Sequence, residues 1–342
     1  MLGAADGRFT HYALRNTQYE ESLMDLICLG ELLIDMFPAE LGRPHAEVSA
    51  FRPVPGGAPA NAAVAAARLG AQAAFIGKVG DDPFGRFLVD VLAREGVETR
   101  GMRLDPEART TMNLMAQSDA NHYDCLFYRN PGADTRLRPD ELDEALLRST
   151  RAFHFGSLSL TDEPARSATV AAVKIAKAAG ALISYDVNYR PTLWKSPEEA
   201  AEQARAMIRY ADLVKVNEAE LALLAGEGAI EATSGALLGM GPSLCVVTLG
   251  PDGGYFRVAS GGGAVPGFPV KTVDATGCGD AFIAGLLWQL VKAGDWRSQL
   301  TSDRLHAALR FANAVGALTA TKQGVIPSLP TAAEVEAFLL ER

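Results

Sequence analysis

The sequence predicts an α/β fold with a central, mostly parallel sheet, covered by helices on both faces, and a small additional β-layer. Short apolar runs of strand type alternate with longer Ala/Leu-rich runs of helical period, and several helical runs end in Gly. Two stretches break this alternation. The length of 342 residues, with 48% hydrophobic residues, suffices for one large domain of this class.

The strand-like runs are rich in β-branched or aromatic residues, and the helix-like runs follow a 3.6-residue period. Strands are expected at 26–35, 73–80, 152–158, 181–188, 212–217, 244–250 and 263–270, and helices at 61–70, 83–96, 163–180, 197–211 and 281–294. Ligands of such folds bind at the carboxyl ends of the strands, so candidate site residues are sought there.

The two irregular stretches are 38–57 and 109–130. The second contains two strand-like runs around a polar SDANH turn. A two-stranded ribbon is not stable alone, so we expect lid segments at about 38–54 and 109–130 that pack over the site or against a partner subunit.

Composition restricts the class of protein further. The net charge of −9 argues against nucleic-acid binding, and no apolar run reaches membrane-spanning length. The four cysteines form no CxxC pair, which favours reduced thiols and a cytoplasmic location. Residues 1–24 lack the apolar core of a signal peptide and are interpreted as an N-terminal extension to one domain at 25–342. A truncation that starts at Met24 is expected to fold.

The stretch VDATGCGDAF (273–282) places a glycine-rich loop and an acid before an apolar helical run. Backbone N–H groups converge in such loops, and the helix dipole adds positive charge, so Gly277, Cys278 and Gly279 are candidates for an anion hole. Asp280 is placed to accept a proton from an attacking hydroxyl or, alternatively, to cap the helix. A complete GxxxxGK[ST] or GxGxxG motif is absent, so another device would hold nucleotide phosphates.

A second candidate region is PGGAPANAAVAAARLG. Its paired glycines, Gly56 and Gly57, allow close approach to a ligand, and the amide of Asn61 can bond two neighbouring hydroxyls. The alternative is a glycine-rich turn with Asn61 as helix cap. Asp35, at the end of the first strand-like run, is either a sugar-hydroxyl acceptor or a solvated turn residue.

These two regions, GGAPANAAVAAARLGAQAAFIGKVGDDPFG (56–85) and DATGCGDAFIAG (274–285), resemble the two signatures of the ribokinase-type (PfkB) carbohydrate kinases. The resemblance covers the chain from about Leu26 to its C-terminus. GGAPAN, NPGAD, DVNYRPTLW and VKVNEAE are similar to the fructokinase branch. The resemblance implies a ribokinase-like three-layer sandwich with a β-sheet lid over the sugar.

By this resemblance Asp280 is the general base, and the N–H groups of Gly277, Cys278 and Gly279 hold the transferring phosphate. Cys278 stands where the family most commonly has Ala. The implied sugar-binding residues are Asp35, Gly56, Gly57 and Asn61. The implied nucleotide-binding residues are Asn188, Arg190, Asn217, Glu220, Thr248, Gly250, Gly253 and Asn313. Three alternatives stay open: Asn217 and Glu220 as a capped helix start, Arg190 in a surface salt bridge, and Asn313 as a satisfied core amide.

The resemblance also implies metal ions. Glu220 would help to organise Mg²⁺ on the phosphates, and Asp274 and Thr276, with the segment TKQGVIPSLP, match a potassium site of many family members. The predicted reaction is ATP-dependent phosphorylation of the 6-hydroxyl of D-fructose. The alternatives are a kinase of 2-keto-3-deoxygluconate, ribose or a nucleoside, with Arg109, Arg129 and Arg190 available for an acidic sugar, and a non-catalytic sugar sensor. A homodimer through the lid is the family-based expectation.

Overall fold

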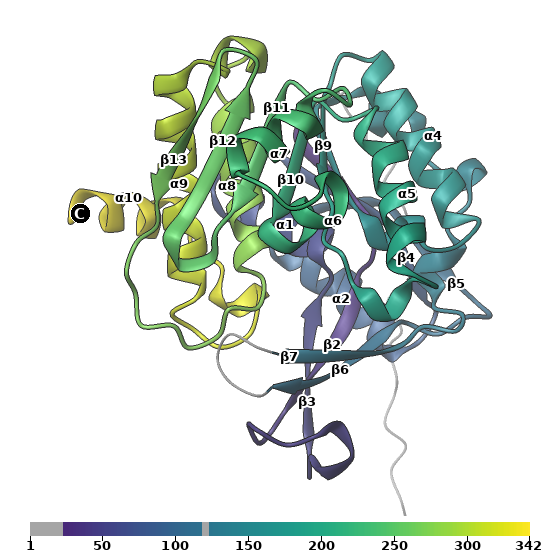
Figure 1. Cartoon of the computed structure of the whole chain (residues 1–342). Coiled ribbons are helices and arrows are strands. Elements are labelled where there is room, and N and C mark those ends of the chain that lie inside the picture. The colour runs from purple at the N-terminus through teal and green to yellow at the C-terminus, as the bar shows by residue number, and fades with distance from the viewer. Residues whose placement is uncertain (1–22, 118–122) are drawn as a thin grey trace, which may run out of the picture.

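The computed structural model describes residues 23–117 and 123–342, so the SDANH turn and nearly all of the predicted extension lie outside the described residues. A nine-stranded sheet forms the centre, in the order β13-β12-β11-β10-β9-β8-β1-β4-β5 (Figure 1). Its strands are β1 (Met24–Leu29), β4 (Ala73–Gly80), β5 (Glu98–Asp105), β8 (Thr150–Gly156), β9 (Leu182–Asp186), β10 (Leu213–Asn217), β11 (Leu244–Thr248), β12 (Gly253–Val258) and β13 (Gly261–Pro266).

The central sheet is parallel from β5 to β11, and β12 and β13 extend it as an antiparallel pair at one edge. Strand β1 pairs with β4 on one side and with β8 on the other. The strand order therefore reverses direction at β1, and such a point opens a crevice outside the carboxyl ends of the strands.

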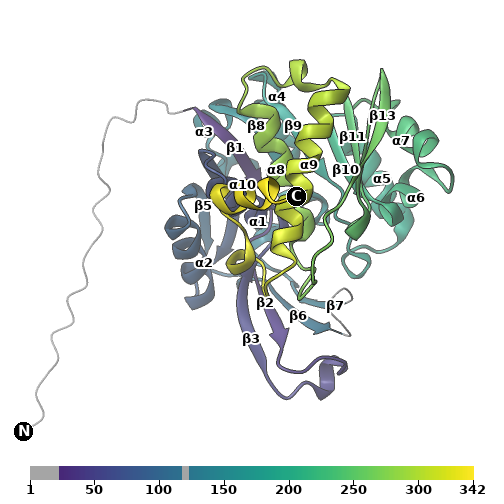
Figure 2. The ribbon, with the colours of Figure 1, turned by 90° about the vertical axis from the view of Figure 1, so that its left-hand side faces the viewer.

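Helices cover both faces of the sheet, as the alternating pattern predicted. They are α1 (Ala58–Arg68), α2 (Pro83–Arg94), α3 (Glu144–Arg148), α4 (Ala165–Ala178), α5 (Pro197–Ile208), α6 (Glu218–Ala225), α7 (Ile230–Leu238), α8 (Cys278–Val291), α9 (Ser302–Thr319) and α10 (Ala332–Leu340). One apolar core joins the sheet to α1, α2, α8, α9 and α10, and the other joins it to α3–α7. Figure 2 shows α8, α9 and α10 together on the face turned toward the viewer.

The single strand predicted at 26–35 is wrong. The chain forms β1 and then a separate strand, β2 (Leu33–Pro38), which belongs to another sheet. Asp35 consequently lies inside β2 rather than at the end of a strand of the central sheet. The run is apolar on both sides of Gly30-Glu31, so its pattern contained no sign of the break.

The lid is a four-stranded sheet, in the order β3-β2-β6-β7, with β3 (Phe51–Gly56), β6 (Met112–Gln117) and β7 (Tyr123–Tyr128) (Figure 1). The two strands expected within 109–130 pair antiparallel, and β2 pairs in parallel with β6. The sheet starts at Leu33, before the expected segment at about 38–54, because β2 supplies one of its inner strands. The edge strand β3 contains Pro53 and Pro55, which cannot donate to a further strand.

Within the described ranges, no individual helix combines the length and the apolar character that crossing a membrane requires. Helices α6 and α7, which meet at 62°, reach that criterion only as a bent pair. Both pack leucines into the core of the central sheet.

Candidate active site

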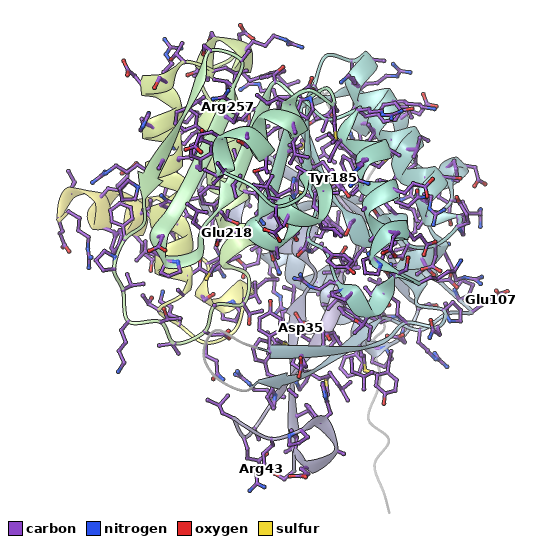
Figure 3. All side chains as sticks on the ribbon, viewed as in Figure 1. Asp35, Arg43, Glu107, Tyr185, Glu218 and Arg257 are labelled. Carbon is purple, nitrogen blue, oxygen red and sulfur yellow. The ribbon has the colours of Figure 1, made fainter. Side chains whose placement is uncertain are left out.

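A pocket lies in the crevice beside β1, between the carboxyl ends of the parallel strands and the lid. Its volume is about 240 Å³, near the lower end of the range for small-molecule sites. The walls come from residues that follow β1, β8 and β9, from β10 and β11, from the first turns of α1, α6 and α8, and from lid strands β2, β6 and β7. Figure 3 shows Asp35 where the lid meets the body, and Arg43 at the far end of the lid.

Asp280 lies in this pocket, in the first turn of α8. The helix begins at Cys278, so Cys278 and Gly279 lie inside it rather than before it, and Gly277 occupies the N-cap position. Gly277 has a φ of +78°, and a Cβ there would overlap with the side chain of Val325, so glycine is required. Among the described residues, the Asp280 carboxylate accepts from Asn61 and from no backbone N–H of α8. The cap alternative is therefore excluded, and the carboxylate faces the pocket.

The environment of Asp280 suits a proton acceptor. Burial raises the pKa of its carboxyl to about 6, and a hydrogen bond from Asn61, whose Nδ2 lies 2.8 Å from Oδ2, opposes that rise. A pKa near the working pH is what general-base catalysis requires. The amide oxygen of Asn61 is buried and has no hydrogen-bond partner among residues 23–117 and 123–342.

The first turn of α8 provides part of the predicted anion hole. The N–H groups of Gly277 and Gly279 have no acceptor among the described residues, whereas the N–H of Cys278 reaches Ala275 O over 3.3 Å. The Cys278 thiol is half-buried, and burial raises its pKa to about 12. A thiol that remains protonated is a poor target for oxidation, so the structure argues against a redox role at this position.

The sugar side of the pocket is built from α1 and the lid. Asp35 accepts a hydrogen bond of 2.8 Å from Asn113 Nδ2, and burial raises the pKa of its carboxyl to about 6. A Cβ on Gly56 would overlap with the Asp35 carboxylate, so glycine leaves space for that side chain. Gly57 and Asn61 line the pocket beside it.

The opposite side carries Asn188, Arg190, Asn217, Glu220 and Thr248, all of which line the pocket. Asn217 and Glu220 form a capping box at the start of α6, as the alternative interpretation proposed. Glu220 is nevertheless only 3% exposed, and its carboxylate also accepts from Tyr189 N. Burial raises the pKa of Glu220. One carboxylate therefore serves both as a helix cap and as part of the pocket wall.

The other predicted nucleotide-binding residues, Gly250, Gly253 and Asn313, do not line the pocket. Gly250 and Gly253 flank the short turn between β11 and β12. The amide of Asn313, on α9, donates to Val265 O and Pro266 O, which are the contacts of a satisfied core amide.

The two segments named for potassium meet in the structure. Asp274 Oδ1 accepts from Thr276 N and Oγ1, and Asp274 Oδ2 accepts from Gly324 N, 50 residues later. Both oxygens of this carboxylate are thus engaged in holding the two loops together. Within residues 23–117 and 123–342, no group of three or more His, Cys, Asp or Glu side chains could hold a metal ion.

Sequence reasoning missed several pocket residues. Glu31 follows β1, and its Oε1 accepts from Ala58 N. Lys215 lies within β10, and its ammonium pairs with Asp186. Lid residues Asn113 and Tyr123 also line the pocket. A charged residue within an otherwise apolar strand, as in DLVKVN, was the signal that would have identified Lys215.

Comparisons with known proteins agree with this geometry. A family model described as pfkB family carbohydrate kinase matches residues 24–332. The probable fructokinase-2 of Arabidopsis thaliana is 46% identical over 316 residues, which cover 92% of this chain and 95% of the relative.

Two solved structures show the same fold. A fructokinase from Xylella fastidiosa with bound ATP has a TM-score of 0.85 at 35% identity, covering 94% of this chain and 99% of its own. A double-mutant fructokinase from Vibrio cholerae O395, solved with fructose, ADP and a potassium ion, has a TM-score of 0.83 at 34% identity, covering 94% and 100%.

The fold and the comparisons define the protein as an ATP-dependent sugar phosphotransferase. The chain belongs to the pfkB family of carbohydrate kinases, which confirms the predicted family and fold class.

Proposed function

We propose that this kinase transfers the γ-phosphoryl group of ATP to the 6-hydroxyl of D-fructose, with Asp280 as the general base. The Asp280 carboxylate carries this proposal, because it lines the pocket together with Asp35 and lies in the same helical turn as Gly277 and Gly279, whose N–H groups have no acceptor among the described residues. The fructokinase names of relatives at 46% identity support the choice of sugar.

In the proposed reaction Asp35, Gly57 and Asn61 hold the sugar, and Asp280 accepts the proton of the attacking hydroxyl. The N–H groups of the first turn of α8 stabilise negative charge on the phosphoryl group in transfer. The lid excludes water that would otherwise compete as acceptor. Thr248, Gly250 and Gly253 remain the proposed nucleotide contacts, whereas the Asn313 amide is engaged with Val265 O and Pro266 O.

Metal ions are also part of the proposal. Mg²⁺ commonly binds through one or two carboxylates, substrate phosphates and water, and the pocket offers it the Glu220 carboxylate. When bound, the ion would neutralise phosphate charge. Potassium at the loops joined by Asp274 and Thr276 would be held mainly by backbone carbonyls. A cytoplasmic location remains a prediction from the cysteine pattern.

An acidic sugar fits the described residues less well. Arg129 donates to Asp134, Thr161 and Leu158 O, so its guanidinium is already engaged. Arg109 is exposed and does not line the pocket, which leaves Arg190 as the candidate partner for a sugar carboxylate. A proton acceptor in the pocket has no role in a non-catalytic sensor, and this disfavours that alternative.

A homodimer through the lid is proposed from the alternation along β7. Tyr123, Cys125 and Phe127 line the pocket, whereas Leu126 and Tyr128 point away and are 45% and 58% exposed. Exposed apolar side chains on an edge strand suit the same face of a second copy.

The test of the sugar is ADP release with MgATP against fructose, 2-keto-3-deoxygluconate, ribose and adenosine, at fixed potassium. Saturable turnover with fructose alone supports the proposal. Strong turnover with another acceptor would refute the assigned sugar while retaining the kinase. Folded protein that binds a sugar but releases no ADP would refute the proposed activity.

A further inference from the structure

Lys215 is a buried cation that neither the core nor the predicted site accounts for. It is the third residue of β10 and is 6% exposed. Its Nζ lies 2.9 Å from Oδ2 and 3.1 Å from Oδ1 of Asp186, the last residue of β9, and the two residues are direct cross-strand neighbours. Burying such a pair costs desolvation that apolar residues would avoid, so the pair is better explained by function than by stability.

The ammonium of Lys215 lies against the first turn of α8. A Cβ on Gly279 would be 3.1 Å from Nζ, which puts the ammonium beside the backbone of the candidate anion hole. Among the described residues that line the pocket, Arg190 and Lys215 are the two cations. Burial alone would lower the pKa of Lys215, but Asp186 and Glu220 outweigh it, so the pKa lies above its usual value and the group stays charged.

We propose that Lys215 contacts the phosphoryl group during transfer and that Asp186 positions it for this contact. An ammonium has three N–H donors, and the two oxygens of Asp186 engage at most two of them, which leaves at least one for a phosphoryl oxygen. The proposal rests on the phosphoryl-transfer role assigned above to the first turn of α8.

The step balances without proton transfer to or from Lys215. The sugar O–H bond breaks as its oxygen forms the new P–O bond, the proton passes to Asp280, and ADP leaves with the bridging oxygen and its electron pair. Lys215 keeps its three protons and stabilises the charge on the phosphoryl oxygens. In other nucleotide-binding proteins, the lysine of a GxxxxGK[ST] loop stabilises this charge, and this sequence lacks that motif.

Replacing Lys215 or Asp186 alone would also change the pKa of the general base, Asp280. Lys215 lowers the pKa of Asp280 and Asp186 raises it, so Lys215→Met moves that pKa up and Asp186→Asn moves it down. The double variant Lys215→Met/Asp186→Asn removes both charges with little change of shape. We therefore measure kcat at pH 8.5, where Asp280 is ionised in every variant. A fall in kcat then reflects loss of the contact between Lys215 and the phosphoryl group.

A matched control is Lys78→Met. Lys78 is equally buried, and its Nζ lies 2.9 Å from Glu141 and 3.4 Å from Asp105, but it does not line the pocket. Loss of Lys78 should lower the melting temperature and leave kcat unchanged below it. The control therefore distinguishes the effect of losing a buried ion pair in general from the effect of losing the pair between Lys215 and Asp186.

The deciding experiment compares the full-length wild type, the double variant and the control by ADP release with fructose and by binding of a non-hydrolysable ATP analogue and of ADP. We expect the double variant to lose about a hundredfold in kcat, with the fructose KM within about threefold of wild type. Affinity for the analogue should fall about tenfold more than affinity for ADP, because only the analogue carries a γ-phosphoryl group.

A folded double variant with kcat within about threefold of wild type would overturn the proposal. So would equal losses of affinity for the analogue and for ADP. A wild type that does not phosphorylate fructose would refute the proposed function instead, and the comparison of the analogue with ADP would still decide the role of Lys215.

Discussion

The side-chain amide of Asn61 donates to the carboxylate of Asp280 over 2.8 Å, and this bond joins the first turn of α1 to the first turn of α8. The two residues come from the two sequence signatures, which are 219 positions apart along the chain. Asn61 was expected to contact the sugar or to cap the helix. The structure gives it a second role, because its hydrogen bond fixes the orientation of the base and favours the ionised carboxylate.

The pH dependence of kcat/KM for the sugar should show an acid limb near pH 6. Burial raises the pKa of both Asp280 and Asp35 to about 6, so the acid limb reflects the titration of the two carboxyls together. Asn61→Ala removes the hydrogen bond that opposes the rise at Asp280. The limb should then move to higher pH, and a pH profile in which the variant and the wild type coincide would contradict the coupling.

Asp280→Asn should stabilise the protein at alkaline pH. Folding raises the pKa of this carboxyl from 3.8 to about 6. The group therefore stabilises the fold at pH values below 3.8, and that contribution is lost as the pH rises through about 6. The ionised group therefore costs about 3 kcal/mol at pH 8, which the amide avoids. Thermal unfolding should show the variant several degrees above wild type at pH 8 and equal to it near pH 4.

Asp90→Asn provides the control for that experiment, because Asp90 is an exposed residue of α2. Its melting temperature should differ from wild type by about a degree or less at either pH. If Asp280→Asn behaves in the same way, the pKa of the Asp280 carboxyl is not raised in the folded protein.

Gly56→Ala should weaken sugar binding selectively. The added methyl group would overlap with the Asp35 carboxylate and displace it, so the sugar KM should rise about tenfold or more while the KM for ATP changes little. Gly235→Ala is the matched control, since its Cβ would meet only Arg257 Nε, at 3.9 Å. Steady-state kinetics that showed equal effects at the two positions would contradict the role of Gly56.

The lid dimer predicts a concentration-dependent mass. Leu126→Glu/Tyr128→Glu places charge on the outward face of β7, without touching Tyr123, Cys125 and Phe127 on the pocket side. Light scattering should give twice the chain mass for wild type and a single chain mass for the variant. A wild type that is monomeric at all concentrations would refute this interface.

The sequence allowed prediction of the layered fold and of most of the pocket wall, for identifiable reasons. The parallel strands are apolar on both faces, which gives a strong signal, and Gly56, Gly57, Gly277 and Gly279 stand close to the starts of two helical runs. Strand β5 was not predicted because ETRGMRLD is half-exposed at the sheet edge and is charged at four of its eight positions. The division of 26–35 into β1 and β2 was not predicted because both strands are apolar and the turn between them has no proline.

The missed site residues share a different cause. Lys215 and Glu31 are charged side chains within or next to buried strands, and their partners are far away in the sequence. The cross-strand pairing that joins Lys215 to Asp186 depends on the register of β9 with β10. No local pattern encodes such a register, so these contacts required the three-dimensional structure.

The most direct test of the central claim is fructose-dependent ADP release by wild type and by Asp280→Asn at pH 8, with the fold of each verified by thermal unfolding. The account predicts saturable turnover for wild type and a loss of at least about a hundredfold in kcat for the variant, with fructose still bound. Near-normal turnover by the folded variant would contradict the assignment of Asp280 as the base.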